Sequence, residues 1–185
     1  GIEYIQFKRL LEHGIKHAYT LKCEGINFRS DSKEEKDSYK KIFENVGLEV
    51  TTRVKPQQRH TDKVSCIDKV MKTEELLETD GLITNKENIT LVTTNADCIL
   101  LLFYDPEKKV IANVHSGWRG TFKKIGEKAI VKMTEEYNCN PEDIEIYIWP
   151  SIRKCHFEVD EEVKDECEKI FKYTEKTNEF IEKGE

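Results

Sequence analysis

The stretch that decides the fold runs from Cys98 to Gly120 and reads CILLLFYDPEKKVIANVHSGWRG. Two apolar runs, 99–104 and 110–114, flank the polar residues 105–108, a pattern typical of two antiparallel strands joined by a tight turn. Residues 99–103 carry no alternating polar position, so we expect a strand buried on both faces. The hairpin is therefore predicted to form the middle of a sheet.

The hairpin also predicts which polar residues meet at its open end. If Tyr104 pairs with Lys109, Cys98 lies directly opposite His115, because antiparallel pairing conserves the sum of the two residue numbers. A thiolate and an imidazole that meet there can be two zinc ligands or a cysteine–histidine catalytic pair. They can equally be a structural thiol beside a hydrogen-bonded histidine, since free cysteine is among the most buried residue types.

Further strands and helices are predicted on both sides of this hairpin. Strands are expected at 15–21, 48–54, 63–67, 89–94 and 144–148, and helices at 32–47, 73–78, 121–133 and 160–171. The expected N-caps are Ser32, Thr73, Thr121 and Asp160. The last helix is expected to turn Val163, Cys167, Ile170 and Phe171 inward. This mixed order predicts an α/β or α+β single-domain sandwich, with one mixed β-sheet covered by helices.

Composition excludes several classes of protein. The chain has 185 residues, a formal net charge of −6 and 36% charged residues, and we treat residues 1–185 as a single domain. No stretch approaches the ~20 apolar residues of a membrane span, and no basic stripe offers a footprint for nucleic acid. The six cysteines form no Cys-x-x-Cys pair and no export signal is visible, which favours a cytoplasmic protein with reduced thiols.

His60 suggests a third member for the Cys98 and His115 pair. It follows the break at Pro56, in a polar segment with no evident structural need for an imidazole. Three protein ligands with one open position are typical of catalytic zinc sites. Copper is the alternative metal, because trigonal His/His/Cys sites also hold it. The five histidines of the chain cannot supply the several centres of a multicopper oxidase.

Residues 117–120, Gly-Trp-Arg-Gly, lead directly into a predicted helix. Free amides at a helix start bind anions, the two glycines let a ligand approach the backbone, and Arg119 adds donors, so this loop is a candidate phosphate site. The alternative is an arginine that pairs with a carboxylate and a tryptophan that fills the core. Either of two nearby aspartates, Asp80 and Asp97, could orient a ligand histidine or act as a general base, and both also suit turn or cap roles. We favour a structural role for Asp80 and an orienting role for Asp97.

Several short motifs resemble, in order, the signature blocks of the laccase-domain family. They are Gln58-Arg59-His60, Asp80-Gly81-Leu82-Ile83-Thr84, Asn95-Ala96-Asp97-Cys98, His115-Ser116-Gly117-Trp118-Arg119-Gly120, and Pro150-Ser151-Ile152 through Cys155 and Phe157-Glu158-Val159. The resemblance spans about residues 15–172. Members of this family, once described as multicopper polyphenol oxidases, are now described as purine nucleoside phosphorylases with adenosine deaminase activity. A bacterial branch is described as a peptidoglycan editing factor.

The resemblance implies a zinc site and a set of functional residues. It implies zinc held by His60, Cys98 and His115, catalytic roles for Cys98, His115 and Asp97, and phosphate or substrate contacts from Lys22, Gln58 and Arg119. The implied substrates are small molecules, a purine nucleoside and phosphate. The implied fold is a mixed-sheet sandwich similar to the catalytic domain of cytotoxic necrotizing factor, which uses a Cys/His pair for deamidation.

The sequence departs from the family pattern at four places, one of which is Trp149, which stands before Pro150 where the family has glycine. Lys22 stands where the family has arginine, which keeps the charge but loses the bidentate fork. His156 replaces a second cysteine, and we expect it either to approach the metal or to pack. The family's C-terminal segment, with a late Cys-Thr and an Arg-rich motif, is not found in the 185 residues.

Three alternatives stand beside a zinc nucleoside enzyme. The first is a metal-free Cys/His hydrolase or amidase that edits peptidoglycan precursors. The second is a copper-dependent polyphenol oxidase. The third is a non-catalytic zinc-binding module, which would need four protein ligands and a closed site.

Overall fold

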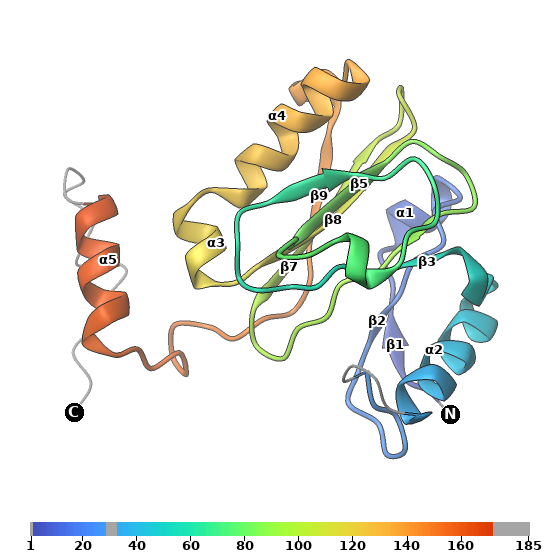
Figure 1. Ribbon diagram of the computed structural model, residues 1–185, viewed down its shortest axis with the longest axis horizontal. Coiled ribbons are helices and arrows are strands. Elements are labelled where there is room, and N and C mark those ends of the chain that lie inside the picture. The colour runs from blue at the N-terminus through green and yellow to red at the C-terminus, as the bar shows by residue number, and fades with distance from the viewer. Residues whose placement is uncertain (1, 29–32, 172–185) are drawn as a thin grey trace.

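A five-stranded mixed sheet forms the centre of the molecule in the computed structural model, which describes residues 2–28 and 33–171 (Figure 1). Its strands, in spatial order, are β4 (Val64–Cys66), β5 (Gly81–Thr84), β8 (Val110–Ser116), β7 (Ile99–Asp105) and β9 (Glu145–Ile148). Strands β4 and β5 are parallel, and the other neighbours are antiparallel. The predicted mixed sheet, with the apolar hairpin at its middle, is confirmed.

Two small sheets and five helices complete the described residues. The small sheets pair β1 (Tyr4–Ile5) with β2 (Tyr19–Thr20) and β3 (Arg53–Val54) with β6 (Thr90–Leu91). The helices are α1 (Lys8–Glu12), α2 (Lys33–Val46), α3 (Trp118–Phe122), α4 (Ile125–Tyr137) and α5 (Glu161–Phe171). Short 3-10 turns lie at Val50–Thr52, Thr73–Glu75 and Pro141–Asp143. No helix among the described residues is long and apolar enough to cross a membrane.

The register of the central hairpin differs from the predicted one. Leu100 pairs with His115, and Asp105 pairs with Val110, so Cys98 lies diagonal to His115 rather than opposite it. The reason is the Asp105 side chain, which ends the strand and accepts hydrogen bonds from the amides of Glu107 and Lys108, both at 2.9 Å. The turn therefore begins one residue later. The sum of the two residue numbers in each pair changes by two. Because this change is even, each side chain still points to the face of the sheet that was predicted.

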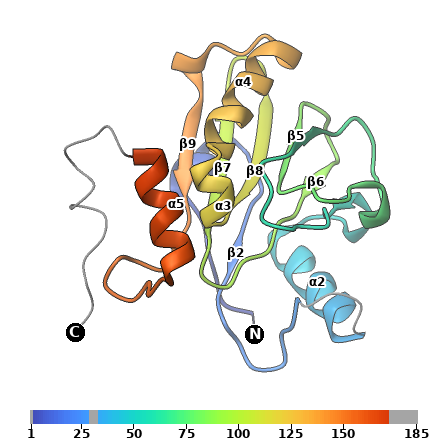
Figure 2. The same ribbon diagram turned by 60° about the vertical axis from the view of Figure 1, so that its left-hand side comes forward.

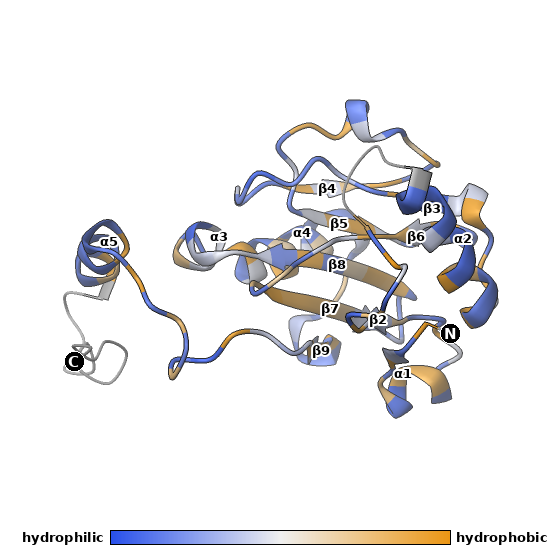
Figure 3. Cartoon of the chain, turned by 90° about the horizontal axis from the view of Figure 1, so that it is seen from below, coloured by the Kyte–Doolittle hydropathy of each residue, from blue (hydrophilic) through white to orange (hydrophobic). Residues whose placement is uncertain are grey.

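Helix α4 covers one face of the sheet and builds the main core against it (Figure 2). The side chains of Ile125, Ala129 and Met133 are fully buried, as their helical spacing predicts. They pack against the hairpin residues that point to this face, which are Phe103, Val110, Ala112 and Val114. Figure 3 shows β7 and β8 as the long hydrophobic strands of the molecule.

Several predicted boundaries are wrong. Thr121 does not cap a helix: it lies inside α3, where its hydroxyl bonds to the Gly117 carbonyl, and Lys124 in the left-handed region (φ 57°) separates α3 from α4. The predicted helix at 73–78 is a 3-10 turn whose N-cap position is Lys72. The strands expected at 15–21, 48–54 and 89–94 are two residues long each, because pairing partners, not propensity, limit them.

The last helix agrees with the prediction only in part. The Asp160 carboxylate caps α5 by accepting a hydrogen bond from the Val163 amide at 3.1 Å. Cys167 is buried, but Ile170 is 42% exposed and does not face inward. The predicted cap Ser32 lies outside the described residues, as does the side chain of Phe171.

Two cross-strand partners provide a test of this core. Phe103 is 2% exposed beneath α4, whereas its β9 partner Ile146, on the same face, is 48% exposed. We expect Phe103→Ala to lower the free energy of unfolding by about 3–5 kcal/mol, and Ile146→Ala by about 1 kcal/mol or less. Urea denaturation followed by circular dichroism measures both values. Equal losses would contradict this account of the core.

Candidate metal centre

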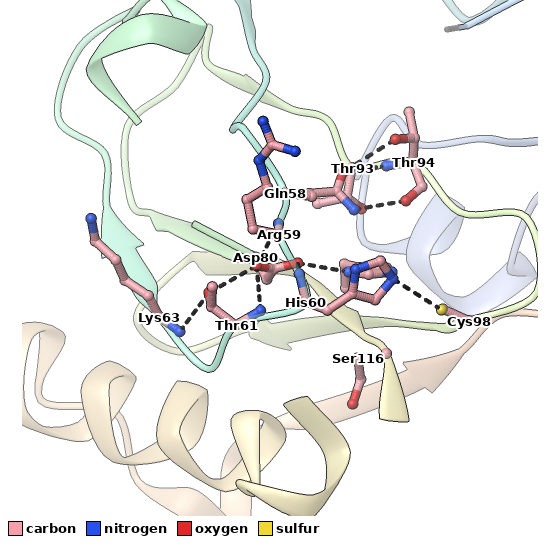
Figure 4. Close-up of polar contacts among 12 residues, drawn as sticks. Gln58, Arg59, His60, Thr61, Lys63, Asp80, Thr93, Thr94, Cys98 and Ser116 are labelled. Carbon is pink, nitrogen blue, oxygen red and sulfur yellow. Dashed lines mark hydrogen bonds and ion pairs between the residues drawn. The ribbon is translucent and has the colours of Figure 1, made fainter. Parts of the chain in front are cut away.

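Three side chains from separate parts of the sequence meet at one end of the central sheet (Figure 4). His115 lies near the end of β8, Cys98 directly precedes β7, and His60 lies in the loop between β3 and β4. Their ligand atoms all lie within 4.8 Å of one another, and Cys98 Sγ is 3.9 Å from His60 Nε2. The predicted convergence of these three residues is therefore present in the structure.

The donor set of this trio fits a transition metal. Two imidazole nitrogens and one thiolate suit zinc or copper, whereas magnesium and calcium prefer oxygen ligands. His115 is buried and Cys98 is half-buried, but His60 is exposed, which leaves one side of the trio accessible. This is the arrangement expected when a fourth ligand comes from solvent or substrate.

The buried carboxylate of Asp80 holds the trio in place. Asp80 is 0% exposed, and its Oδ1 accepts hydrogen bonds from His115 Nδ1 at 2.8 Å and from the His60 amide at 3.0 Å. Its Oδ2 accepts from the amides of Arg59 at 3.1 Å and Thr61 at 2.8 Å. Because Asp80 engages Nδ1, Nε2 of His115 is the nitrogen left free for a metal.

Either aspartate could have oriented a ligand histidine, and we had favoured Asp97 for that role and a structural role for Asp80. The structure places the Asp80 carboxylate against His115. Asp80 is a cross-strand neighbour of His115, whose amide donates to the Asp80 carbonyl at 2.7 Å. Asp97 is exposed, and its described contact is its backbone carbonyl, which accepts a hydrogen bond from Ile152. Its proposed role in proton transfer stays a prediction.

The protonation of the site follows from burial and these hydrogen bonds. Burial opposes ionisation of the Asp80 carboxyl, but the hydrogen bonds from His115 and Thr61 outweigh it and lower its pKa to about 2. Burial likewise opposes the charge on His115, but the contacts with Asp80 and Cys98 raise its pKa to about 9. Although His60 is exposed at the surface, part of its ring is covered, and its pKa is lowered first by this partial burial and then by the charge of His115.

His60 has a backbone conformation that few non-glycine residues adopt. Its φ is 59°, in the left-handed region, which costs about 1 kcal/mol or more. The three consecutive amides that donate to Asp80 offset this cost. The turn at 59–61 is thus fixed by the same carboxylate that orients His115, so one group sets two ligands.

The glycines of the Gly-Trp-Arg-Gly loop make room for this turn. A Cβ at Gly117 would lie 2.4 Å from Cδ2 of His60, and a Cβ at Gly120 would lie 2.9 Å from the Thr61 carbonyl oxygen. We had expected the two glycines to let a ligand approach the backbone. In the structure the space beside them is filled by the metal-binding turn itself.

The remaining predicted site residues have different surroundings. Gln58 is engaged at both ends of its amide: Nε2 donates to the Thr94 carbonyl at 2.7 Å and Oε1 accepts from the Thr94 amide at 2.8 Å. It thereby ties the His60 loop to the segment that leads to Cys98. Arg119 stacks on Trp118, 4.0 Å from the ring centroid, and pairs with Glu162 at 2.9 Å.

Two other predicted residues do not belong to the trio. Lys22 lies exposed on the loop after β2, and no hydrogen bond or ion pair described for it reaches the trio. His156 is exposed and contacts Cys155, with 3.0 Å between Nδ1 and Sγ. It is not part of the His60, Cys98 and His115 group, so the described residues give no support for a closed site with four protein ligands.

Sequence reasoning ranked Asp80 below Asp97 and missed the steric role of Gly117. Asp80 belongs to the Asp-Gly-Leu-Ile-Thr motif that we quoted, and this was the available signal. Its importance depends on β5 pairing with β8, which places Gly81 opposite Val114. Spacing along the chain gave no indication of that pairing.

A mixed sheet with a His/His/Cys trio at the end of its central hairpin defines a candidate single-centre metalloprotein. The chain belongs to the family described as multi-copper polyphenol oxidoreductase laccase, whose model matches residues 14–184. The resemblance inferred from the motifs is thereby confirmed.

Curated relatives carry a different description. The chain is 37% identical over 144 residues to a purine nucleoside phosphorylase of Clostridium acetobutylicum, covering 78% of this chain and 59% of that protein. It is 43% identical over 90 residues to purine nucleoside phosphorylase YlmD of Bacillus subtilis, covering 49% of this chain and 32% of that protein. The chain therefore spans less than two thirds of the length of these relatives.

A solved structure supports the same fold. The crystal structure of the hypothetical protein YfiH of Bacillus licheniformis matches with a TM-score of 0.73 and 25% sequence identity. The match covers 83% of this chain and 59% of that one. The mixed sheet described above is therefore the fold of this family.

The close approach of Gly117 and His60 yields a prediction about metal affinity. The φ of Gly117 is −67°, which alanine adopts freely, so Gly117→Ala tests the clash alone. We expect zinc affinity to fall about 10- to 100-fold, because His60 must move. The matched control is Gly126→Ala, whose Cβ would meet the flexible end of Leu101, Cδ1, at 3.3 Å and Phe103 Cζ at 3.9 Å. Competition with a chelator measures both, and unchanged affinity of Gly117→Ala would contradict the geometry.

The two aspartates yield a second prediction. Asp80→Asn keeps the shape of the side chain but replaces one accepting oxygen with an NH2 group, which donates. This group would face the backbone amides that now donate to Asp80, so we expect zinc affinity to fall about 10- to 100-fold. The unfolding free energy should also fall by about 1–3 kcal/mol. Asp97→Asn serves as the control and should leave zinc affinity unchanged. If Asp97→Asn were the variant that loses zinc, the assignment of Asp80 as the orienting residue would fail.

Proposed function

We propose that this protein is a zinc-dependent purine nucleoside phosphorylase that also deaminates adenosine. The observation that carries the proposal is the convergence of His60, Cys98 and His115 within 4.8 Å. The names of the curated relatives supply phosphorolysis and the substrate class, whereas deamination is implied by the family resemblance alone. The substrates are then small molecules, a purine nucleoside with phosphate or with water.

Zinc is favoured over copper by the number of metal-binding groups. The described residues contain one cluster of three histidine, cysteine or acidic side chains close enough to share an ion. A polyphenol oxidase of the multicopper type needs several centres. Zinc, when bound, supplies Lewis acidity without redox chemistry, which suits phosphorolysis and deamination because neither reaction transfers electrons to an external acceptor.

Arg119 is the residue that we propose to hold phosphate in phosphorolysis. There, a phosphate oxygen bonds to C1′ of the ribose while the bond from C1′ to the base nitrogen breaks, and the base leaves with the bonding electrons. The Arg119 side chain is 49% exposed and its partner Glu162 is 64% exposed. Such a surface ion pair is weak, so phosphate can replace the carboxylate. Lys22 and Asp97 stay proposals, as a second phosphate contact and a proton carrier.

A second candidate function uses the same residues without a metal. Cys98 Sγ lies 3.9 Å from His60 Nε2 and also contacts His115, which is the pairing of a nucleophile and a base. A cysteine hydrolase or amidase would need a free thiolate. Tight, stoichiometric zinc would make that thiolate unavailable, so metal content separates the two functions.

The proposal predicts both a metal content and an activity. Purified protein should hold about one zinc per chain by elemental analysis. It should convert inosine and phosphate to hypoxanthine and ribose 1-phosphate, and adenosine to inosine. Cys98→Ala should lose the zinc and lower kcat/KM at least ~100-fold, because one of three ligands is gone. Cys155→Ala, which removes an exposed thiol outside the trio, is the matched control.

Four outcomes would contradict the proposal. One is the absence of any product from either nucleoside with zinc-loaded protein. Another is full activity of Cys98→Ala. The third is an amidase activity that requires Cys98 and persists in zinc-free protein, which would support the cysteine hydrolase instead. Copper in place of zinc, with oxidation of a phenol, would support an oxidase.

A further inference from the structure

Strand β9 is an edge of the central sheet, and within residues 2–28 and 33–171 no strand pairs with its outer side. Figure 3 shows β4 and β9 at opposite ends of the row of strands. The β4 edge is short and partly covered: it has three residues, Val64 is 7% exposed, and the Cys66 thiol contacts Tyr137 of α4. Strand β9 therefore presents the less protected edge of the sheet.

The pairing of β9 with β7 determines which of its backbone groups point outward. The Trp149 amide donates to the Leu100 carbonyl at 3.1 Å, and β9 keeps one register with β7 along its whole length. Hydrogen-bonded and non-bonded pairs alternate along an antiparallel ladder, so the odd-numbered residues of β9 bond to β7. The amides and carbonyls of Ile146 and Ile148 consequently point away from the sheet.

The side chains of the same two isoleucines are exposed on the α4 face. Ile146 is 48% exposed and Ile148 is 57% exposed. Native edge strands commonly avoid pairing through lysine, proline or a bulge, but β9 reads Glu-Ile-Tyr-Ile. Its single charged residue, Glu145, points to the opposite face, where it pairs with Arg9. Both the backbone and the side chains of this edge are thus suited to a further strand.

A second copy of β9 fits this edge in one antiparallel register. When Tyr147 lies opposite its own copy, Ile146 of each chain pairs with Ile148 of the other, because antiparallel pairing conserves the sum of the residue numbers. The exposed isoleucines of both copies then meet on one face. Their outward amides and carbonyls can exchange the hydrogen bonds of the ladder. A two-fold axis beside Tyr147 relates the chains, which is the commonest symmetry of homodimers.

The charges that flank β9 favour the same arrangement. Glu142 and Asp143 precede the strand, Arg153 follows it, and all three residues are exposed. In an antiparallel pair, the start of one strand lies beside the end of the other. With Tyr147 on the axis, Arg153 of each chain comes near Glu142 of the other copy, so opposite charges meet. A parallel pair would instead place the acidic residues of the two copies together.

We propose that β9 is the surface through which two copies of this chain pair, edge to edge, into one continuous sheet. The isoleucines and the metal-binding trio lie on opposite faces of the central sheet, so pairing leaves the trio open and does not depend on the reaction that it catalyses. Paired four-residue strands bury less surface than a standard interface. We therefore expect a weak dimer, with a Kd on the order of 10 µM.

Sedimentation velocity of the purified chain, at concentrations below and above this Kd, measures the pairing. The chain should change from monomer to dimer as its concentration rises. Ile148→Lys should weaken the dimer at least ~10-fold, because the ammonium group would lie opposite Ile146 of the other copy. Val131→Lys changes a side chain that is 46% exposed on α4, away from this edge. It is the matched control and should leave the dimer unchanged.

Cross-linking tests the register. Residues that face each other in a non-bonded antiparallel pair have Cα atoms about 4.5 Å apart, which is close enough for a disulfide. Mild oxidation should therefore link two chains of Tyr147→Cys. Ile146→Cys is the matched control. Its two new thiols would be offset by two residues along the strands, which is too far for a disulfide to form, so this variant should stay unlinked.

Hydrogen exchange measured by NMR distinguishes a second copy from other strands that could cover the edge. The amides of Ile146 and Ile148 should exchange rapidly in the monomer and slowly in the dimer, whereas the Tyr147 amide should be protected in both. If the chain is monomeric at every concentration, the proposal is overturned. Protection of the two isoleucine amides in that monomer would mean that another segment of the same chain covers β9.

A dimer of a different kind would overturn the proposal as well. One sign would be a dimer that keeps its full strength in Ile148→Lys. Another would be a dimer that Tyr147→Cys does not cross-link. If Ile148→Lys fails to fold by circular dichroism, the concentration dependence of hydrogen exchange in the wild type decides together with the cross-link.

Discussion

The buried carboxylate of Asp80 is the constraint on which the site depends. It accepts hydrogen bonds from the His115 ring and from three consecutive amides of the 59–61 turn. An ionised carboxylate in a fully buried position is stable only when its oxygens are satisfied in this way. These donors belong to the His115 ring and to the turn that carries His60. The hydrogen bonds that stabilise the buried charge therefore also set the geometry of the candidate metal centre.

The same linkage explains why the Gly-Trp-Arg-Gly loop has its sequence. The 59–61 turn must lie against this loop for His60 to reach Cys98, and only glycine leaves enough space at 117 and 120. Gln58 fixes the turn from its other end through Thr94. Motifs that are separate in the sequence are therefore parts of one packed unit, in which each backbone contact fixes the position of a ligand.

The central hairpin connects this unit to the rest of the molecule. One face of β7 and β8 buries its side chains under α4 and supplies most of the core. The other face carries the trio at its end and borders a cavity along its length. Stability and chemistry thus use opposite faces of the same two strands. A change in the core should consequently affect folding before it affects the site, because the rigid strands separate the two.

The sequence by itself determined the central hairpin, the mixed sheet, the buried face of α4 and the three residues of the candidate metal centre. The first three follow from continuous apolar runs and helical spacing, and the trio follows from the position of Cys98 and His115 at the open end of the hairpin and from the family motifs. Only the tertiary structure decided the exact register, which aspartate contacts His115, and the steric need for Gly117. Each of these depends on which strand or turn lies beside which, and pairing between distant segments leaves no periodic signal in the chain.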